Sequence, residues 1–178
     1  MKLINSNYKY FLMIILAFLI DSILSYFLPY DFTKQSLMLV PSIGVLVFVL
    51  IMLRIKEKHY SYAVLTGFYY GLFYGNALPI YMIIYVMIVF MVKIISKFYL
   101  SSWLEALTLF VSTIFIYHLS IYLLMYITKM TSLKIIDYIL RRFLPSLLLN
   151  IVLGMIIYFI FKLCHKNEEW GGYHEYTS

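Results

Sequence analysis

Six long apolar runs, separated by short polar connections, occupy most of this 178-residue chain. Several of these runs approach the length of about 20 residues that a helix needs to cross the hydrocarbon core of a bilayer. The pattern predicts an all-α integral membrane protein, with six transmembrane helices in a single domain over residues 1–166. The predicted spans are residues 9–28, 37–53, 61–77, 79–96, 103–127 and 139–163.

Composition agrees with this class, because 64% of the residues are hydrophobic and 12% are charged. The first run follows Lys2 and Lys9 as a secretory signal would, but Asp21 interrupts it and no small-residue cleavage pattern follows. It is therefore expected to remain as an uncleaved signal-anchor. The polar tail over 167–178 is expected to be a disordered cytoplasmic extension.

The net charge of +6 comes from basic residues at the ends of the predicted spans, so topology explains it better than nucleic-acid binding. With both termini in the cytoplasm, the basic residues are biased toward the inside, as the positive-inside rule requires. The loop at 54–59, RIKEKH, is also suited to anionic lipid or a cytoplasmic partner. The inside set is Lys2, Lys9, Arg54, Lys56, Lys58, Lys93, Lys97, Lys162 and Lys166, and the outside set is Lys34, Lys129, Lys134, Arg141 and Arg142.

The last apolar run contains polar residues that a simple membrane anchor would lack. Within RRFLPSLLLNIVLG, four residues recur at intervals of four: Arg142, Ser146, Asn150 and Gly154. This spacing places them in one slowly drifting polar and small stripe on a helix, beside Pro145. The stripe is predicted to be a packing or partner face that seats another helix.

Asp21 and Arg142 are ionisable residues inside predicted spans, which makes each a functional candidate. Both are expected in the outer half of the membrane, so an ion pair between them is plausible. The alternative is that Arg142 extends to external headgroups while Asp21 is neutral or bonded to Ser25.

The third run predicts a second packing face, because Gly67, Gly71 and Gly75 lie four residues apart. Small residues at this spacing let two helices approach closely within a bilayer. A tight turn is expected between Asn76 and Pro79. The resulting hairpin is short for a membrane span, and the sequence leaves open whether it is simply short, tilted, or set in thinned bilayer.

Candidate chemistry is sparse. No sequence motif for a catalytic site, a phosphate loop, a metal site or a cofactor is present, and the single cysteine, Cys164, excludes an internal disulfide. His118 suits a proton relay in principle, although a neutral histidine bonded to a neighbour is the more common role. Four tyrosines gather around the predicted hairpin and are candidates to line a polar groove: Tyr69, Tyr70, Tyr74 and Tyr81.

Three segments give the chain a resemblance, nearly full length, to the rod shape-determining MreD family, particularly its Gram-positive branch. They are Asp21-Ser22 in the first span, GFYYGLFYG at 67–75, and RRFLPSLLLN at 141–150. One departure is Asn76, because the family often has an aspartate shortly after the second glycine of the third-span motif. Any role of that aspartate is not transferred to this chain.

The resemblance implies a non-catalytic scaffold of the bacterial cell-elongation machinery in the cell membrane. Such a protein would bind MreC and link MreB filaments to RodA-type glycosyltransferases and penicillin-binding transpeptidases, and thereby support peptidoglycan synthesis and cell shape.

The family's fold also looks like that of the substrate-binding subunits of energy-coupling-factor vitamin transporters. Vitamin uptake is therefore the alternative function. The first helices of those subunits commonly carry an Ala-x-x-x-Ala docking face, whereas the first span here has only Ala17.

Overall fold

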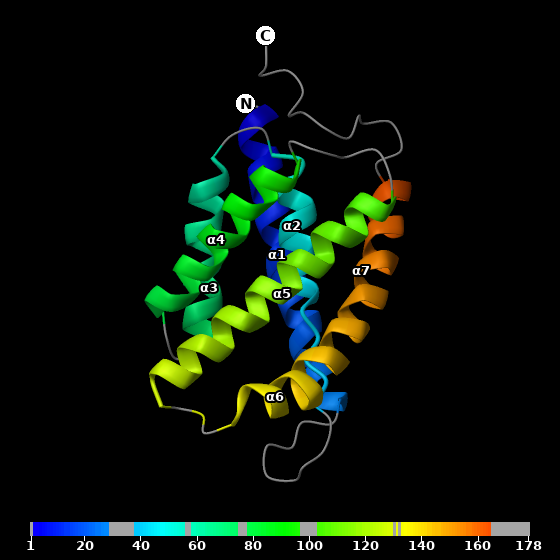
Figure 1. Ribbon diagram of the computed structural model, residues 1–178. Helices are drawn as coiled ribbons and strands as arrows, with labels where there is room; N and C mark the ends of the chain where they lie inside the picture. The colour runs from blue at the N-terminus through cyan, green and yellow to red at the C-terminus, as the bar shows by residue number, and fades with distance from the viewer. Residues whose placement is uncertain are drawn as a thin grey trace.

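The computed structural model describes residues 2–28, 38–55, 58–74, 78–96, 103–129, 131 and 133–164. These residues form an all-α bundle (Figure 1). The helices are α1 (Lys2–Phe27), α2 (Ile43–Met52), α3 (His59–Phe73), α4 (Leu78–Ser96), α5 (Trp103–Ile127), α6 (Ile135–Tyr138), the π-helical turn η1 (Ile139–Phe143) and α7 (Leu144–Cys164).

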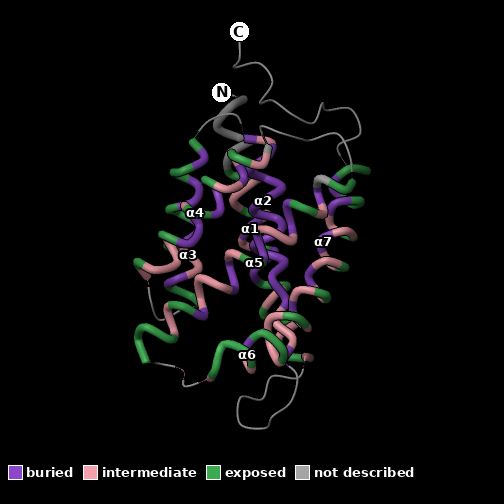
Figure 2. The backbone as a smooth tube through the Cα atoms, viewed as in Figure 1, coloured by how far each residue is buried: buried purple, intermediate pink, exposed green. Residues whose placement is uncertain are grey.

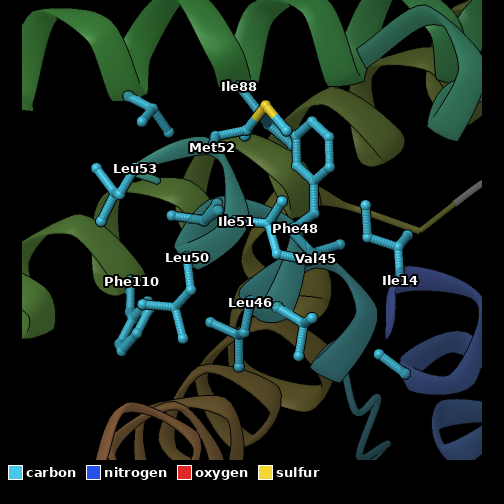
Figure 3. Close-up of a cluster of buried hydrophobic side chains, with 14 of the residues drawn as sticks. Ile14, Val45, Leu46, Phe48, Leu50, Ile51, Met52, Leu53, Ile88 and Phe110 are labelled. Atoms are coloured by element: carbon cyan, nitrogen blue, oxygen red, sulfur yellow. The ribbon is translucent and has the colours of Figure 1, made fainter. Parts of the chain in front are cut away.

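The short helix α2 is the centre of the bundle. All ten of its residues are buried, and it contacts α1, α4, α5 and α7 (Figure 2). Val45, Phe48 and Ile51 belong to a continuous apolar cluster that Ile14 of α1 and Ile88 of α4 complete (Figure 3). A helix that is apolar on every side is stable only when other elements surround it, and α2 meets this condition.

The helices α3 and α4 form an antiparallel hairpin at one side of α2, and α5 and α7 pack together at another (Figure 1). The turn η1 leads directly into α7. In η1 the Leu144 N–H bonds to the Ile139 carbonyl, five residues back. Such π-helical turns are rare and commonly mark functional positions.

Within the described part of the chain, four helical segments have the length and apolarity of a membrane span: Tyr8–Phe27, Leu78–Ile95, Ala106–Ile127 and Ile135–Leu163. The other two predicted spans are shorter. Of the run over 37–53, the described residues 38–53 are helical only from Ile43 to Met52, and α3 ends at Phe73, four residues before the predicted limit of 77. The chain is thus a multi-pass membrane protein in which two of the predicted spans, now α2 and α3, are helices below the usual spanning length.

Candidate functional site

The polar side chains of α7 bind an extended piece of backbone, residues 38–42, which precedes α2. The Ser146 hydroxyl accepts a hydrogen bond from the Val40 N–H (3.0 Å) and donates one to the Met38 carbonyl (3.3 Å). The Asn150 side chain accepts from the Ser42 N–H (2.7 Å) and donates to the Val40 carbonyl (2.8 Å). Residues 38, 40 and 42 therefore face α7 as alternate residues of a strand would.

A proline supplies one more bond to this segment. Pro145 has no N–H, so the Arg141 carbonyl four residues earlier loses its usual helical donor. That carbonyl instead accepts from the Met38 N–H at 2.8 Å. The proline in RRFLPS thereby leaves an acceptor available for the extended segment.

Asp21 of α1 holds the start of α2. Its two carboxylate oxygens accept from the N–H groups of Ile43 (2.6 Å) and Gly44 (2.7 Å). The first N–H groups of a helix have no partner within the helix, and a carboxylate there also matches the helix dipole. Asp21 thus caps α2 from another helix, in place of the side chain of Ser42, which makes no capping bond.

Together these contacts form what we call the α2 clasp, made by Asp21, Arg141, Pro145, Ser146 and Asn150 around residues 38–44. Non-helical backbone is tolerated at membrane depth only when its polar groups are satisfied, because hydrocarbon offers no hydrogen bonds. A buried polar group left without a partner costs about 1–3 kcal/mol. The clasp supplies those partners from α1, η1 and α7.

Glycines allow the bundle to close around the clasp. A Cβ on Gly44 would lie 2.1 Å from the Phe18 ring of α1, and one on Gly154 would lie 2.9 Å from the Phe110 ring of α5. The stripe on α7 therefore divides its contacts. Ser146 and Asn150 bind extended backbone, where we expected them to contact a helix. Gly154 does contact a helix, α5.

Arg142 is partly buried beside the clasp, with its guanidinium carbon 5.9 Å from the centre of the Tyr138 ring. The neighbouring Arg141 makes an exposed ion pair with Asp137 at 3.6 Å. Since the bonds of Asp21 to α2 do not exclude a further charged neighbour, the pair between Asp21 and Arg142 stays a prediction.

Two of the three predicted packing glycines lie against α4 of the same chain. A Cβ on Gly67 would be 2.6 Å from the Met82 Cα, and one on Gly71 would be 2.9 Å from the Leu78 Cα. These are backbone atoms, so close approach of α3 and α4 requires glycine at both positions. Gly75, like Asn76, lies outside the described residues.

The tyrosines near the hairpin form a packed aromatic cluster. The ring of Tyr70 lies 5.1 Å from Phe18 and 4.8 Å from Tyr81, and its hydroxyl accepts from the Tyr117 hydroxyl at 3.0 Å. These contacts indicate a structural role for the rings that we considered as the lining of a groove.

The buried His118 differs from the expected histidine bonded to a neighbour. Neither ring nitrogen has a hydrogen-bond partner among the described residues. The ring lies between aromatic neighbours, 5.6 Å from Tyr117 and 6.1 Å from Phe143. Its backbone carbonyl accepts from the Tyr138 hydroxyl at 2.9 Å, which ties α5 to the start of the last span.

Sequence reasoning singled out Asp21, Pro145, Ser146 and Asn150, but it missed the contribution of the Arg141 carbonyl and the backbone segment that these residues bind. The available signal was Pro41-Ser42, within the run predicted as one span over 37–53. A proline disfavours helix at the preceding residue, and serine is typical of a helix N-cap, so this pair predicts a helix that starts at 43.

The clasp has a structural role, because its polar side chains are hydrogen-bonded to backbone groups of the same chain. Among the described residues, no group of three or more His, Cys, Asp or Glu is placed to hold a metal ion.

No curated protein and no solved structure gives a significant match to the chain. The family described as rod shape-determining protein MreD matches residues 6–167 and so includes the clasp, the hairpin and every described helix beyond the first turns of α1. On this match, the chain belongs to the MreD family of rod shape-determining proteins.

Proposed function

We propose that this chain is a non-catalytic scaffold of the cell-elongation machinery, which binds MreC and connects MreB to RodA-type glycosyltransferases and penicillin-binding transpeptidases. The observation that carries the proposal is the use of the intramembrane polar residues. Asp21, Ser146 and Asn150 bond to backbone groups of the same chain. Residues committed to such bonds support a fixed architecture, as a scaffold needs.

The proposed orientation has both termini in the cytoplasm. The first helix begins and the last helix ends at the same end of the bundle (Figure 1). Arg54 lies over the Phe161 ring at 5.2 Å, and Lys162 lies 5.9 Å from the Tyr158 ring. Basic side chains gather at that end, as the positive-inside rule favours for the cytoplasmic face.

Cysteine labelling tests the orientation. In a chain with Cys164→Ser, we expect Lys58→Cys to react from the cytoplasmic side and Lys129→Cys to react from outside. Labelling of Lys58→Cys by an impermeant reagent in intact cells would contradict this orientation.

Co-purification tests the scaffold. The tagged full chain, expressed with full-length MreC, should recover MreC in a fixed ratio, whereas an unrelated single-span membrane protein should not be recovered. Depletion of the chain in its host should disturb the placement of new peptidoglycan.

Failure to recover MreC, together with saturable binding of a vitamin to the purified chain, would instead favour the transporter class. Two resemblances remain predictions from sequence. One is to the substrate-binding subunits of vitamin transporters, and the other is to the Gram-positive branch of the MreD family.

A further inference from the structure

Tyr85 of α4 carries a buried hydroxyl group that lacks a hydrogen-bond partner. The side chain is fully buried, and among the described residues no group bonds to its hydroxyl oxygen. Its ring centre lies 5.0 Å from that of Phe48 on α2 and 6.1 Å from that of Tyr70 on α3. Most buried side-chain polar atoms have a partner, and an exception commonly marks a bound water or ion. The Tyr85 hydroxyl therefore marks a candidate binding site inside the bundle.

The neighbouring hydroxyls of Tyr70 and Tyr117 supply a second hydrogen that needs an acceptor. Their oxygens lie 3.0 Å apart and share one hydrogen bond. Each hydroxyl carries one hydrogen, so this bond uses only one of the two, whichever way it points. Among the described residues, neither hydroxyl makes a further hydrogen bond. The pair therefore has one hydrogen left to donate, next to the ring of Tyr85.

Asp21 of α1 has unused acceptor capacity near these hydroxyls. Its two oxygens each accept one bond, from the N–H groups of Ile43 and Gly44. A carboxylate offers about four lone-pair sites, so about two remain. The carboxylate is close enough to Tyr70 and Tyr85 to interact electrostatically with both. Neither hydroxyl bonds to it directly, so the donors and the acceptor are neighbours that still lack a connecting group.

A water molecule has the chemistry to connect these groups. Buried waters typically make about three hydrogen bonds to polar groups that lack other partners. A water at this position can accept from the Tyr85 hydroxyl and from the Tyr70–Tyr117 pair, and can donate to Asp21. The Asp21 carboxylate disfavours an anion here. Among the described residues, no group of three or more His, Cys, Asp or Glu is placed to hold a metal cation.

We propose that α1, α3, α4 and α5 enclose a bound water that links the Asp21 carboxylate to the hydroxyls of Tyr85 and Tyr70. The water completes the hydrogen bonding of the buried tyrosines and uses the acceptor capacity that the capping of α2 leaves on Asp21. It thereby connects the α2 clasp to the α3/α4 hairpin through one internal polar site. This property is separate from the proposed scaffold function and does not depend on it.

Removal of the Tyr85 hydroxyl tests this proposal through the sign of its effect. Tyr85→Phe in the full chain keeps the ring, and loss of a satisfied hydrogen bond should lower the thermal unfolding midpoint in nanodiscs by about 2–4 °C. A buried hydroxyl without any bond destabilises the fold, so an unchanged or raised midpoint would overturn the proposal. Tyr138→Phe, which loses a bond to the His118 carbonyl, should also lower the midpoint, whereas the exposed Tyr26→Phe should not.

A second measurement uses the unmodified chain and so does not depend on tolerance of a substitution. A crystal structure of the full chain in a lipid mesophase, at a resolution that shows ordered water, locates the partners of the Tyr85 oxygen directly. We expect a single water peak within hydrogen-bond distance of that oxygen, of the Asp21 carboxylate, and of the Tyr70 or Tyr117 hydroxyl. A direct bond from Tyr85 to a protein acceptor, an unbonded Tyr85 oxygen, or density too large for water would overturn the proposal.

Discussion

The α2 clasp and the α3/α4 hairpin both hold segments of the chain together within the membrane, but they use different interactions. In the clasp, side chains of α1 and α7 bond to interrupted backbone. In the hairpin, both helices satisfy their own backbone, and glycine lets them approach closely. Lipid gives no hydrophobic driving force between helices, so intact helices associate through close packing. An interrupted helix additionally needs hydrogen-bond partners, so specific polar residues are required only in the clasp.

The largest loss of stability is expected from Asn150→Leu in the clasp. This change leaves the Ser42 N–H and the Val40 carbonyl without their side-chain partner, and each such buried group costs about 1–3 kcal/mol. Thermal unfolding in nanodiscs should show a large drop in the midpoint. The control is Val152→Leu at an exposed position of the same helix, which should unfold near the wild-type temperature. Equal midpoints for the two variants would contradict the role of Asn150.

Gly67→Leu should break the hairpin by overpacking. Its Cβ would fall 2.6 Å from the Met82 Cα and 2.7 Å from the Tyr81 carbonyl oxygen, so backbone must move. We expect a loss of about 1–3 kcal/mol. Gly71→Leu should also destabilise, whereas the exposed Phe68→Leu should have little effect in the same unfolding assay. Wild-type stability of Gly67→Leu would show that α3 and α4 do not need this close approach.

Asp21→Leu should cost about 0.5–2 kcal/mol, the usual range for loss of a helix N-cap. Asp21→Asn should cost less, because its amide oxygen can still accept one of the two bonds to α2. The series is compared by unfolding in nanodiscs, with the exposed Ile23→Leu as control. If Asn and Leu are equally harmful, capping does not explain the requirement for Asp21.

A double-mutant cycle of Asp21→Leu with Arg142→Leu measures the predicted ion pair separately from capping. If the pair exists, the double variant should be less harmful than the two effects added, by about 0.5–3 kcal/mol. Strict additivity would remove the pair and leave capping as the role of Asp21.

The smallest effect is expected from Pro145→Ala, below about 1 kcal/mol. Alanine restores an N–H that can compete with Met38 for the Arg141 carbonyl. Exchange of the Met38 amide hydrogen should therefore become faster, while unfolding changes little. Unaltered exchange at Met38 would show that the proline does not control this bond.

Much of the fold could be predicted from sequence, because membrane spans follow from length and apolarity alone. The segments over 79–96 and 103–127 were placed within a residue of α4 and α5. The run over 37–53 was not, since apolarity does not distinguish a spanning helix from a short buried one. The interruption depended on Pro41 and Ser42, whose local signal is weak within so apolar a stretch.

By itself, the sequence determined that this is a multi-pass membrane protein. It also singled out Asp21, Ser146 and Asn150, because a polar side chain within a membrane span is costly unless it has a hydrogen-bond partner. Only the tertiary structure decided what those residues bind. Their partners are backbone groups of residues 38–44, up to 110 positions away along the chain. Every residue carries a backbone carbonyl, and every residue except proline carries an N–H. Residue type can therefore indicate where a helix is interrupted, as Pro41 and Ser42 do, but it does not identify which side chains will bind the exposed backbone groups.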